Sequence, residues 1–180
     1  LNVIQQTNAG IPTGLFSSCE QKDSILNLND LIMGEDLFGF WNSTGLPSGS
    51  LDSQSGMLNL SSVLSGSYQI QYIVKGSGAC PSDTSTVEIN LNPTPKAIAG
   101  IDQEIGCKTP QVIIGDVTNG TEPGSEILWN SVGGQQINDP TLPTQLINQP
   151  GTYVLKIQNQ QNGCFDLDTV FIGMGSNFIK

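Results

Sequence analysis

The chain has 180 residues, with 16 acidic side chains, six lysines, no arginine and no histidine, which gives a formal net charge of −10. This acidity excludes partners that are bound through their phosphates, so we expect neither nucleic acid nor an anionic membrane surface as a partner. We also expect no membrane insertion, because the chain has no apolar run long enough for a membrane helix. The absence of histidine removes the usual general base near neutral pH and the commonest zinc ligand. We therefore predict a non-enzymatic protein without catalytic residues or a cofactor.

Glycine and proline are abundant, with 21 and 10 copies, while charged residues make up only 12% of the chain. This balance favours turns and strands over helices and predicts an all-β fold. No apolar run reaches the roughly 18 residues of a membrane helix, and residues 1–10 lack the pattern of a signal peptide. Four cysteines suit an oxidising compartment. We expect an extracellular protein, either mature or cut from a longer one.

Alternation of apolar and polar residues between turn residues predicts short strands in the first half of the chain. They lie near residues 2–8, 24–29, 38–43, 57–60, 67–75 and 84–91. A single helical turn is the alternative at residues 30–33. The Asn-Pro-Thr-Pro segment at 92–95 follows, and its two prolines favour an extended linker.

The second half of the chain shows a similar series of strand patterns. They lie near residues 97–105, 111–115, 126–130, 134–138, 144–148, 151–158 and 167–173. Asn119-Gly120 and Asn162-Gly163 tolerate a left-handed backbone and predict tight turns. Six or seven short strands in each half indicate a β-sandwich of the immunoglobulin-like kind. We therefore predict two tandem sandwich domains, residues 1–93 and 94–180.

The two halves repeat one another, which supports this division. Cys19 and Cys107 are each followed 22 residues later by a tryptophan. Three further pairs of segments match: 9–11 with 99–101, 66–68 with 151–153, and 83–84 with 168–169.

The four cysteines occupy equivalent places in the two repeats. Of the three possible connectivities, pairing within each domain is the simplest, Cys19 with Cys80 and Cys107 with Cys164. Each bridge would close a loop of about 60 residues and contribute on the order of 4 kcal/mol in the chain-entropy model. Redox or metal chemistry is the alternative, although no Cys-X-X-Cys spacing supports it.

Two aromatic residues recur in each repeat. Trp41 and Trp129 lie in strand patterns with apolar neighbours at alternate positions, which indicates core residues. A platform that stacks on sugars is the alternative, but duplication in register favours the core. Tyr68 and Tyr153 follow a glycine at the start of a strand and resemble the tyrosine that closes a corner in immunoglobulin-like sandwiches.

Several of these motifs together resemble a known family. Residues 99–107, Pro-Gly-Thr-Tyr at 150–153 and Asp-Thr-Val at 168–170 are similar to the PKD-like and immunoglobulin-like repeats of large Bacteroidetes surface proteins. The resemblance covers nearly the whole chain, although residues 30–55 are longer and richer in Gly, Ser and Asp than their counterpart. Similar repeats occur in gliding-motility adhesins and in cargo of the type IX secretion system. The resemblance implies export to the bacterial cell surface and a scaffold role.

The same resemblance implies O-glycosylation. Secreted Bacteroidetes proteins carry glycans at Asp, then Ser or Thr, then an apolar residue, so Ser24 and Thr169 are the candidate acceptors of a glycoprotein. The alternative is that Asp168 and Thr169 simply begin the last strand.

Calcium is the one metal for which the sequence offers candidate ligands. Asp166 and Asp168 lie two apart on a predicted strand and therefore share a face. A solvated acidic face is the simpler interpretation, because neither belongs to an EF-hand-type loop. Paired carboxylates also hydrolyse glycosides, but nothing in the sequence brings two of them to one cleft.

We therefore expect a stalk or adhesive module of a larger exported surface protein. Its expected partners are neighbouring repeats of the same chain, surface glycans or other copies of itself. One alternative is a self-assembling filament subunit that exchanges residues 1–9 as a strand. The other is a carbohydrate-binding module, which requires an exposed Trp41.

Overall fold

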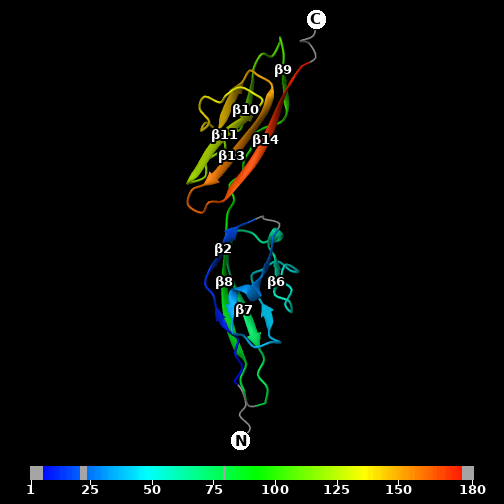
Figure 1. Ribbon diagram of the computed structural model, residues 1–180, viewed down its shortest axis with the longest axis vertical. Helices are drawn as coiled ribbons and strands as arrows, with labels where there is room; N and C mark the ends of the chain where they lie inside the picture. Colours follow the sequence, from blue (N-terminus) through cyan, green and yellow to red (C-terminus); the bar gives the residue numbers. More distant parts are fainter. Residues whose placement is uncertain (1–5, 21–23, 79, 176–180) are drawn as a thin grey trace. The chain divides into compact units, whose positions relative to one another are not determined.

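The computed structural model describes residues 6–20, 24–78 and 80–175. The chain divides into two compact units, Leu1–Pro93 and Thr94–Lys180 (Figure 1), and each has its own apolar core. Strands form nearly all the regular structure, so the protein is all-β. Within the described ranges, no helix has the length and apolar character needed to span a membrane.

The first unit is built around one four-stranded sheet. Its strands are β1 (Ile11–Pro12), β2 (Phe16–Cys19), β3 (Ile25–Asn27), β4 (Ile32–Met33), β5 (Phe40–Asn42), β6 (Met57–Asn59), β7 (Gly66–Val74) and β8 (Asp83–Asn92). The main sheet has the order β2-β8-β7-β5. Two small sheets, β3-β6 and β1-β4, accompany it together with the 3₁₀ turns η1 (Leu28–Leu31) and η2 (Leu60–Ser62).

Alternation along the two long strands places the core of this unit. Every second residue of β8 is buried, as in Val87, Ile89 and Leu91, while the residues between them face outward. Leu28 and Leu58, from η1 and β6, belong to the same core cluster. The small sheets therefore pack on the main sheet as a sandwich.

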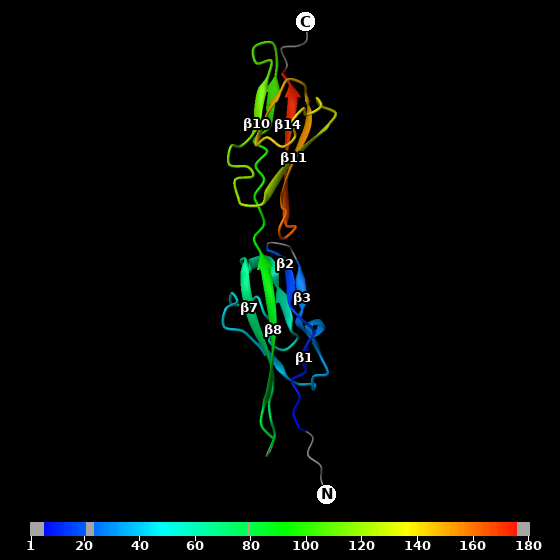
Figure 2. The same cartoon turned by 90° about the vertical axis from the view of Figure 1, so that its left-hand side faces the viewer.

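The second unit has two sheets. Its strands are β9 (Gln103–Ile105), β10 (Val112–Gly115), β11 (Ser125–Val132), β12 (Thr144–Ile147), β13 (Gly151–Asn159) and β14 (Phe165–Met174) (Figure 2). The larger sheet has the order β11-β13-β14-β9, and β10 pairs with β12. Ile114 and Ile147 of the small sheet share a core with Trp129, Leu155 and Ile172 of the large one. This arrangement is consistent with an immunoglobulin-like sandwich.

Several predicted elements differ from the structure. Of the strand predicted at 2–8, residues 2–5 lie outside the described part, and 6–8 are not in a strand. Residues 97–102 and 134–138 form no strand either, because side chains rather than main-chain ladders hold these segments. The helical turn predicted at 30–33 begins earlier, as η1, because Asn27 caps it by accepting from the Asn29 amide.

Candidate functional site

An early strand runs parallel to the last strand in each unit. β2 pairs with β8 from Phe16 opposite Ile89 to Cys19 opposite Asn92. β9 pairs with the end of β14 in the same sense. Parallel neighbours in one sheet place the start of the first strand and the end of the last strand at opposite ends of the pair. Tension along the chain therefore slides these strands past one another and loads all their hydrogen bonds together.

Two carboxylates of β14 hold the segment that leads into the second unit. Asp166 Oδ2 accepts from the Ala97 amide at 2.9 Å, and Asp168 Oδ2 accepts from the Ala99 amide at 2.8 Å. Side-chain acceptors thus take the place of the main-chain carbonyls of a strand ladder. This explains why residues 97–102 follow β14 without forming a strand.

A buried asparagine binds the residue between these two amides. Asn119 is 3% exposed. Its Oδ1 accepts from the Ile98 amide at 3.0 Å, and its Nδ2 donates to the Ile98 carbonyl at 2.8 Å. Asp166, Asn119 and Asp168 therefore fix three consecutive residues, and we call these three side chains the clamp.

The first unit has a shorter version of the clamp. Asp83 Oδ2 accepts from the Ala9 amide at 2.8 Å, and Ser85 Oγ donates to the Gly10 carbonyl at 2.9 Å. Asp83 therefore has the role of Asp168 in the second repeat.

The candidate calcium ligands are thus engaged by the main chain. The second oxygens of Asp166 and Asp168 accept from the amides of Leu167 and Thr169. In the part of the chain that the structure describes, no group of three or more Asp, Glu, Cys or His residues is placed to hold a metal. Both carboxylates have a structural role, and cation binding by them stays a prediction.

Both tryptophans lie in the cores. Trp41 and Trp129 are 1% and 2% exposed. Their Nε1 atoms donate to Asn29 Oδ1 at 3.1 Å and to the Leu142 carbonyl at 3.0 Å. Neither ring has a free face on which a sugar could stack, so carbohydrate binding through Trp41 has no structural basis.

The repeated tyrosines make equivalent hydrogen bonds. Tyr68 donates its hydroxyl to the Leu64 carbonyl, and Tyr153 donates to the Gln149 carbonyl, both at 2.8 Å. Each bond reaches four residues back along the chain, as in the tyrosine corner of immunoglobulin-like domains. These residues therefore close a loop at the start of β7 and of β13.

The predicted pairing of Cys19 with Cys80 does not occur. Cys19 lies opposite Asn92, the last residue of β8, whereas Cys80 precedes Asp83, the first residue of that strand. Ten strand residues span roughly 30 Å, and a disulfide needs Cα atoms within about 7 Å. Cys19 is disulfide-bonded, but β8 separates it from Cys80.

The second predicted bridge is absent for the same reason. Cys164 directly precedes β14, while Cys107 follows β9, which pairs with the far end of β14 through Ile105 and Met174. Cys164 is disulfide-bonded, and Cys107 carries a free, exposed thiol. Equivalent positions in two repeats therefore did not indicate proximity within either repeat.

The candidate glycan acceptors differ in exposure. Ser24 is half-buried, and Asp23 of its motif lies outside the described residues. Thr169 is exposed on β14, while Asp168 of its motif belongs to the clamp. Glycosylation of either residue stays a prediction.

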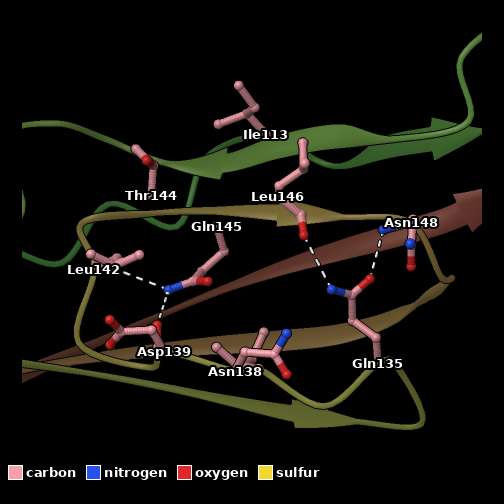
Figure 3. Close-up of a pocket in the computed structure, with 10 residues that line it drawn as sticks. Ile113, Gln135, Asn138, Asp139, Leu142, Thr144, Gln145, Leu146 and Asn148 are labelled. Carbon is pink, nitrogen blue, oxygen red and sulfur yellow. Dashed lines mark hydrogen bonds between the residues drawn. The ribbon is translucent and has the colours of Figure 1, made fainter.

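A groove of about 580 Å³ lies beside β12 in the second unit (Figure 3). Gln135 Nε2 donates to the Leu146 carbonyl at 3.1 Å, and Gln135 Oε1 accepts from the Asn148 amide at 2.7 Å. Gln145 Nε2 donates in the other direction, to the Asp139 carbonyl at 2.7 Å. Two side-chain amides thus join β12 to residues 135–142, which form no strand.

The lining of this groove combines polar and apolar side chains. It mixes amide side chains with Ile113, Leu142 and Leu146, and Asp139 is its one ionisable residue. The Thr141 hydroxyl and amide donate to Asp139 and lower the pKa of its carboxyl. The groove therefore offers hydrogen bonds and apolar contact, without a pair of groups to exchange protons.

Sequence patterns alone do not predict the roles of most of these residues. Asn119 stood in an Asn-Gly turn signal, which says nothing about burial of its side chain. Gln135 and Gln145 belong to no motif, and their partners lie on other segments. Spacing in the sequence did show that Asp166 and Asp168 share one side of a strand.

No protein family matches this chain, and no curated protein matches its sequence. Among solved structures, it is similar to a SusE-like surface polysaccharide-binding protein of Bacteroides thetaiotaomicron, with 12% identity and a TM-score of 0.43 over 94% of this chain and 35% of that one. Immunoglobulin domains 1–5 of Sidekick-1 match with 14% identity and a TM-score of 0.35, over 94% and 40% of the two chains. Drosophila N-cadherin EC1-4 matches with 9% identity and a TM-score of 0.37, over 96% and 49%. The chain spans about a third to a half of these proteins.

Proposed function

We propose that this chain is a load-bearing module, a stalk or adhesive segment of a larger exported surface protein, and that it has no catalytic activity. The observation that carries the proposal is the parallel pairing of an early strand with the last strand in both units. When a unit is pulled through its ends, all the hydrogen bonds between these two strands resist the force together, rather than breaking one at a time. Asp166 and Asp168 in the second unit, and Asp83 and Ser85 in the first, fasten the leading segment of each unit to its last strand.

The proposed location is outside the cell, at a bacterial surface. The acidic composition and the disulfide-bonded cysteines support an oxidising, extracellular setting. Export by the type IX system and a role in gliding motility rest on the resemblance to Bacteroidetes repeats alone.

The groove beside β12 supports a second candidate function, the binding of an uncharged polar ligand. The exposed amide of Asn138 suits the hydroxyls of a surface glycan or the main chain of a peptide, and Ile113 and Leu146 offer apolar contact beside it. This function would make the module adhesive as well as load-bearing.

Single-molecule pulling tests the load-bearing function. With disulfides reduced, so that tension follows the main chain through β9, one tether joins the two chain ends and shears β9 against β14. The other joins Cys107, whose free thiol follows β9, to the C-terminal end, so that the same two strands are unzipped from one end. We expect β9 and β14 to separate at a clearly higher force in the first geometry.

Two variants serve as controls. Asp168→Ala should lower the shearing force of the second unit, because the Ala99 amide loses its acceptor. Glu88→Gln, on the exposed face of β8, should leave both units unchanged. Equal forces in the two pulling geometries would overturn the proposal.

A further inference from the structure

The outer side of the larger sheet in the second unit carries large apolar side chains among polar ones. Along β11, β13 and β14, outward positions alternate with core positions. Five outward side chains are large and apolar, each between 42% and 66% exposed: Leu128, Val132, Phe165, Leu167 and Phe171. We call these five residues the apolar face. The register places two of its pairs in rows, Leu128 and Leu167 on either side of Lys156, and Val132 and Phe171 on either side of Thr152.

The corresponding side of the first unit is mostly polar. Outward positions of β7 and β8 hold Gln69, Gln71, Thr84, Thr86 and Glu88. Because Asp83 and Asp168 are equivalent in the two repeats, Thr86 is the counterpart of Phe171. A sandwich of this kind therefore folds without an apolar residue at that position, so folding alone does not explain Phe171.

The two charged side chains near the apolar face are hydrogen-bonded to neutral side-chain amides within the unit. Lys156 Nζ donates to Gln158 Oε1 at 2.7 Å and lies 4.8 Å from the ring centroid of Phe165. Glu126, at one corner, accepts a hydrogen bond from Gln160. The whole chain carries a net charge of −10, so two copies repel one another over most of their surface. On β11, β13 and β14 the outward side carries one acidic residue, Glu126, and one basic residue, Lys156, so it adds little to that repulsion.

The size of the apolar face matches what an interface between two proteins needs. Partly exposed side chains of this size leave on the order of 500 Å² of apolar surface in contact with water, at the upper end for a monomeric protein. A standard interface buries about 800 Å² on each partner, of which about 56–65% is apolar. The apolar face supplies that apolar share.

We propose that the apolar face binds the apolar face of a second copy of this chain. Sheets pack face to face about 10 Å apart with their side chains interdigitated, and a two-fold axis brings the same patch of both copies together. A small ligand would need a concave site instead. The interface buries Phe171 and Leu167 of both copies and leaves the groove beside β12 on the opposite sheet.

Sedimentation velocity over a range of concentrations tests this proposal. We expect the 19.1 kDa chain to reach twice its monomer mass as concentration rises. Added salt should strengthen the dimer, because salt screens repulsion between acidic copies. Phe171→Lys should raise the dissociation constant at least about tenfold, as expected for a central apolar contact.

Two further variants separate association from folding. Thr86→Lys introduces the same charge at the equivalent position of the first unit and should leave the dimer unchanged. Phe171→Thr places at this position the residue that the first unit already has, so it should fold and still weaken the dimer. Retained emission from buried tryptophan confirms folding of each variant. A chain that stays monomeric at all concentrations and salt levels, or a dimer that persists in Phe171→Lys, overturns the proposal.

Discussion

Asn119 shows how one side chain replaces part of a strand ladder. It is buried, and it binds both main-chain groups of Ile98 and also the Pro143 carbonyl. An unpaired main-chain group away from water is costly. The clamp therefore contributes to stability mainly by pairing main-chain groups that the sheets leave without partners.

Replacing Asn119 by Ala should lower the free energy of unfolding of the second unit by about 2–4 kcal/mol, because three main-chain groups lose their partner. Chemical denaturation followed by tryptophan fluorescence measures the change. Asn138→Ala is the matched control, since Asn138 is exposed, and it should change stability by less than about 0.5 kcal/mol. An equal effect of both substitutions would contradict the role of the clamp.

Asp116 and Asp139 show how short turns tune acidity. The hydroxyl and amide of Thr118 lower the pKa of Asp116, and Thr141 does the same for Asp139. A carboxyl whose pKa is lower in the folded state stabilises the fold above its unfolded pKa, and this contribution is lost as pH falls through the folded pKa. Acid should therefore begin to destabilise the chain below about pH 4.

Thr118→Val removes the hydroxyl and keeps the shape of the side chain. We expect the pKa of Asp116 to rise toward its usual value while that of Asp139 stays unchanged, and the reverse for Thr141→Val. Carboxyl carbon NMR titration resolves the two groups. A parallel rise of both pKa values in one variant would point to a global change instead.

At Gly115, the last residue of β10, neighbouring elements come so close that the choice of residue is restricted. Gly115 has a φ of +88°, and a Cβ there would lie 2.4 Å from the Pro143 carbonyl oxygen and 3.0 Å from Trp129 Cζ2. Glycine is the residue that both the backbone conformation and the space require. β10, β11 and the segment before β12 therefore meet at this residue.

Gly115→Ala should destabilise the second unit by about 3 kcal/mol or more, because backbone strain and a main-chain clash add together. Gly133→Ala is the control: its φ is +70°, but a Cβ there meets nothing within 4 Å. It should cost only about 1 kcal/mol. Thermal denaturation of both variants gives the comparison, and similar losses would show that strain alone matters.

At the scale of the whole molecule, alkylation of the cysteines distinguishes the observed state of each thiol from the state that the predicted disulfides require. An alkylating agent added without reductant should label Cys107, whose thiol is exposed, and leave Cys164 unlabelled. Reduction should expose Cys19 and Cys164 to the same reagent. Peptide mapping by mass spectrometry reads both steps, and a protected Cys107 in the native chain would restore the bridge within the second unit.

The local alternation of apolar and polar residues was enough to predict the bounds of the long strands. Residues 66–74, 83–92, 151–159 and 165–174 agree with the sequence prediction to within two residues at each end, because side-chain alternation is a property of the strand itself. The inward positions of Trp41 and Trp129 follow from the same alternation. β2 was missed, since Phe16–Cys19 is too short and too polar to show a period.

The sequence by itself determined the all-β class, the repeat and the faces of the long strands, since composition and two-residue periodicity are local properties. Tertiary structure alone decided the clamp, the groove and the separation of the cysteines that were predicted to pair. Asp168 and Ala99 are 69 residues apart in the chain. They come together only because the segment that leads into β9 runs beside β14, with which β9 pairs in parallel. The same register separates Cys107 from Cys164 by the length of a strand, so equivalent places in a repeat do not reveal which residues touch.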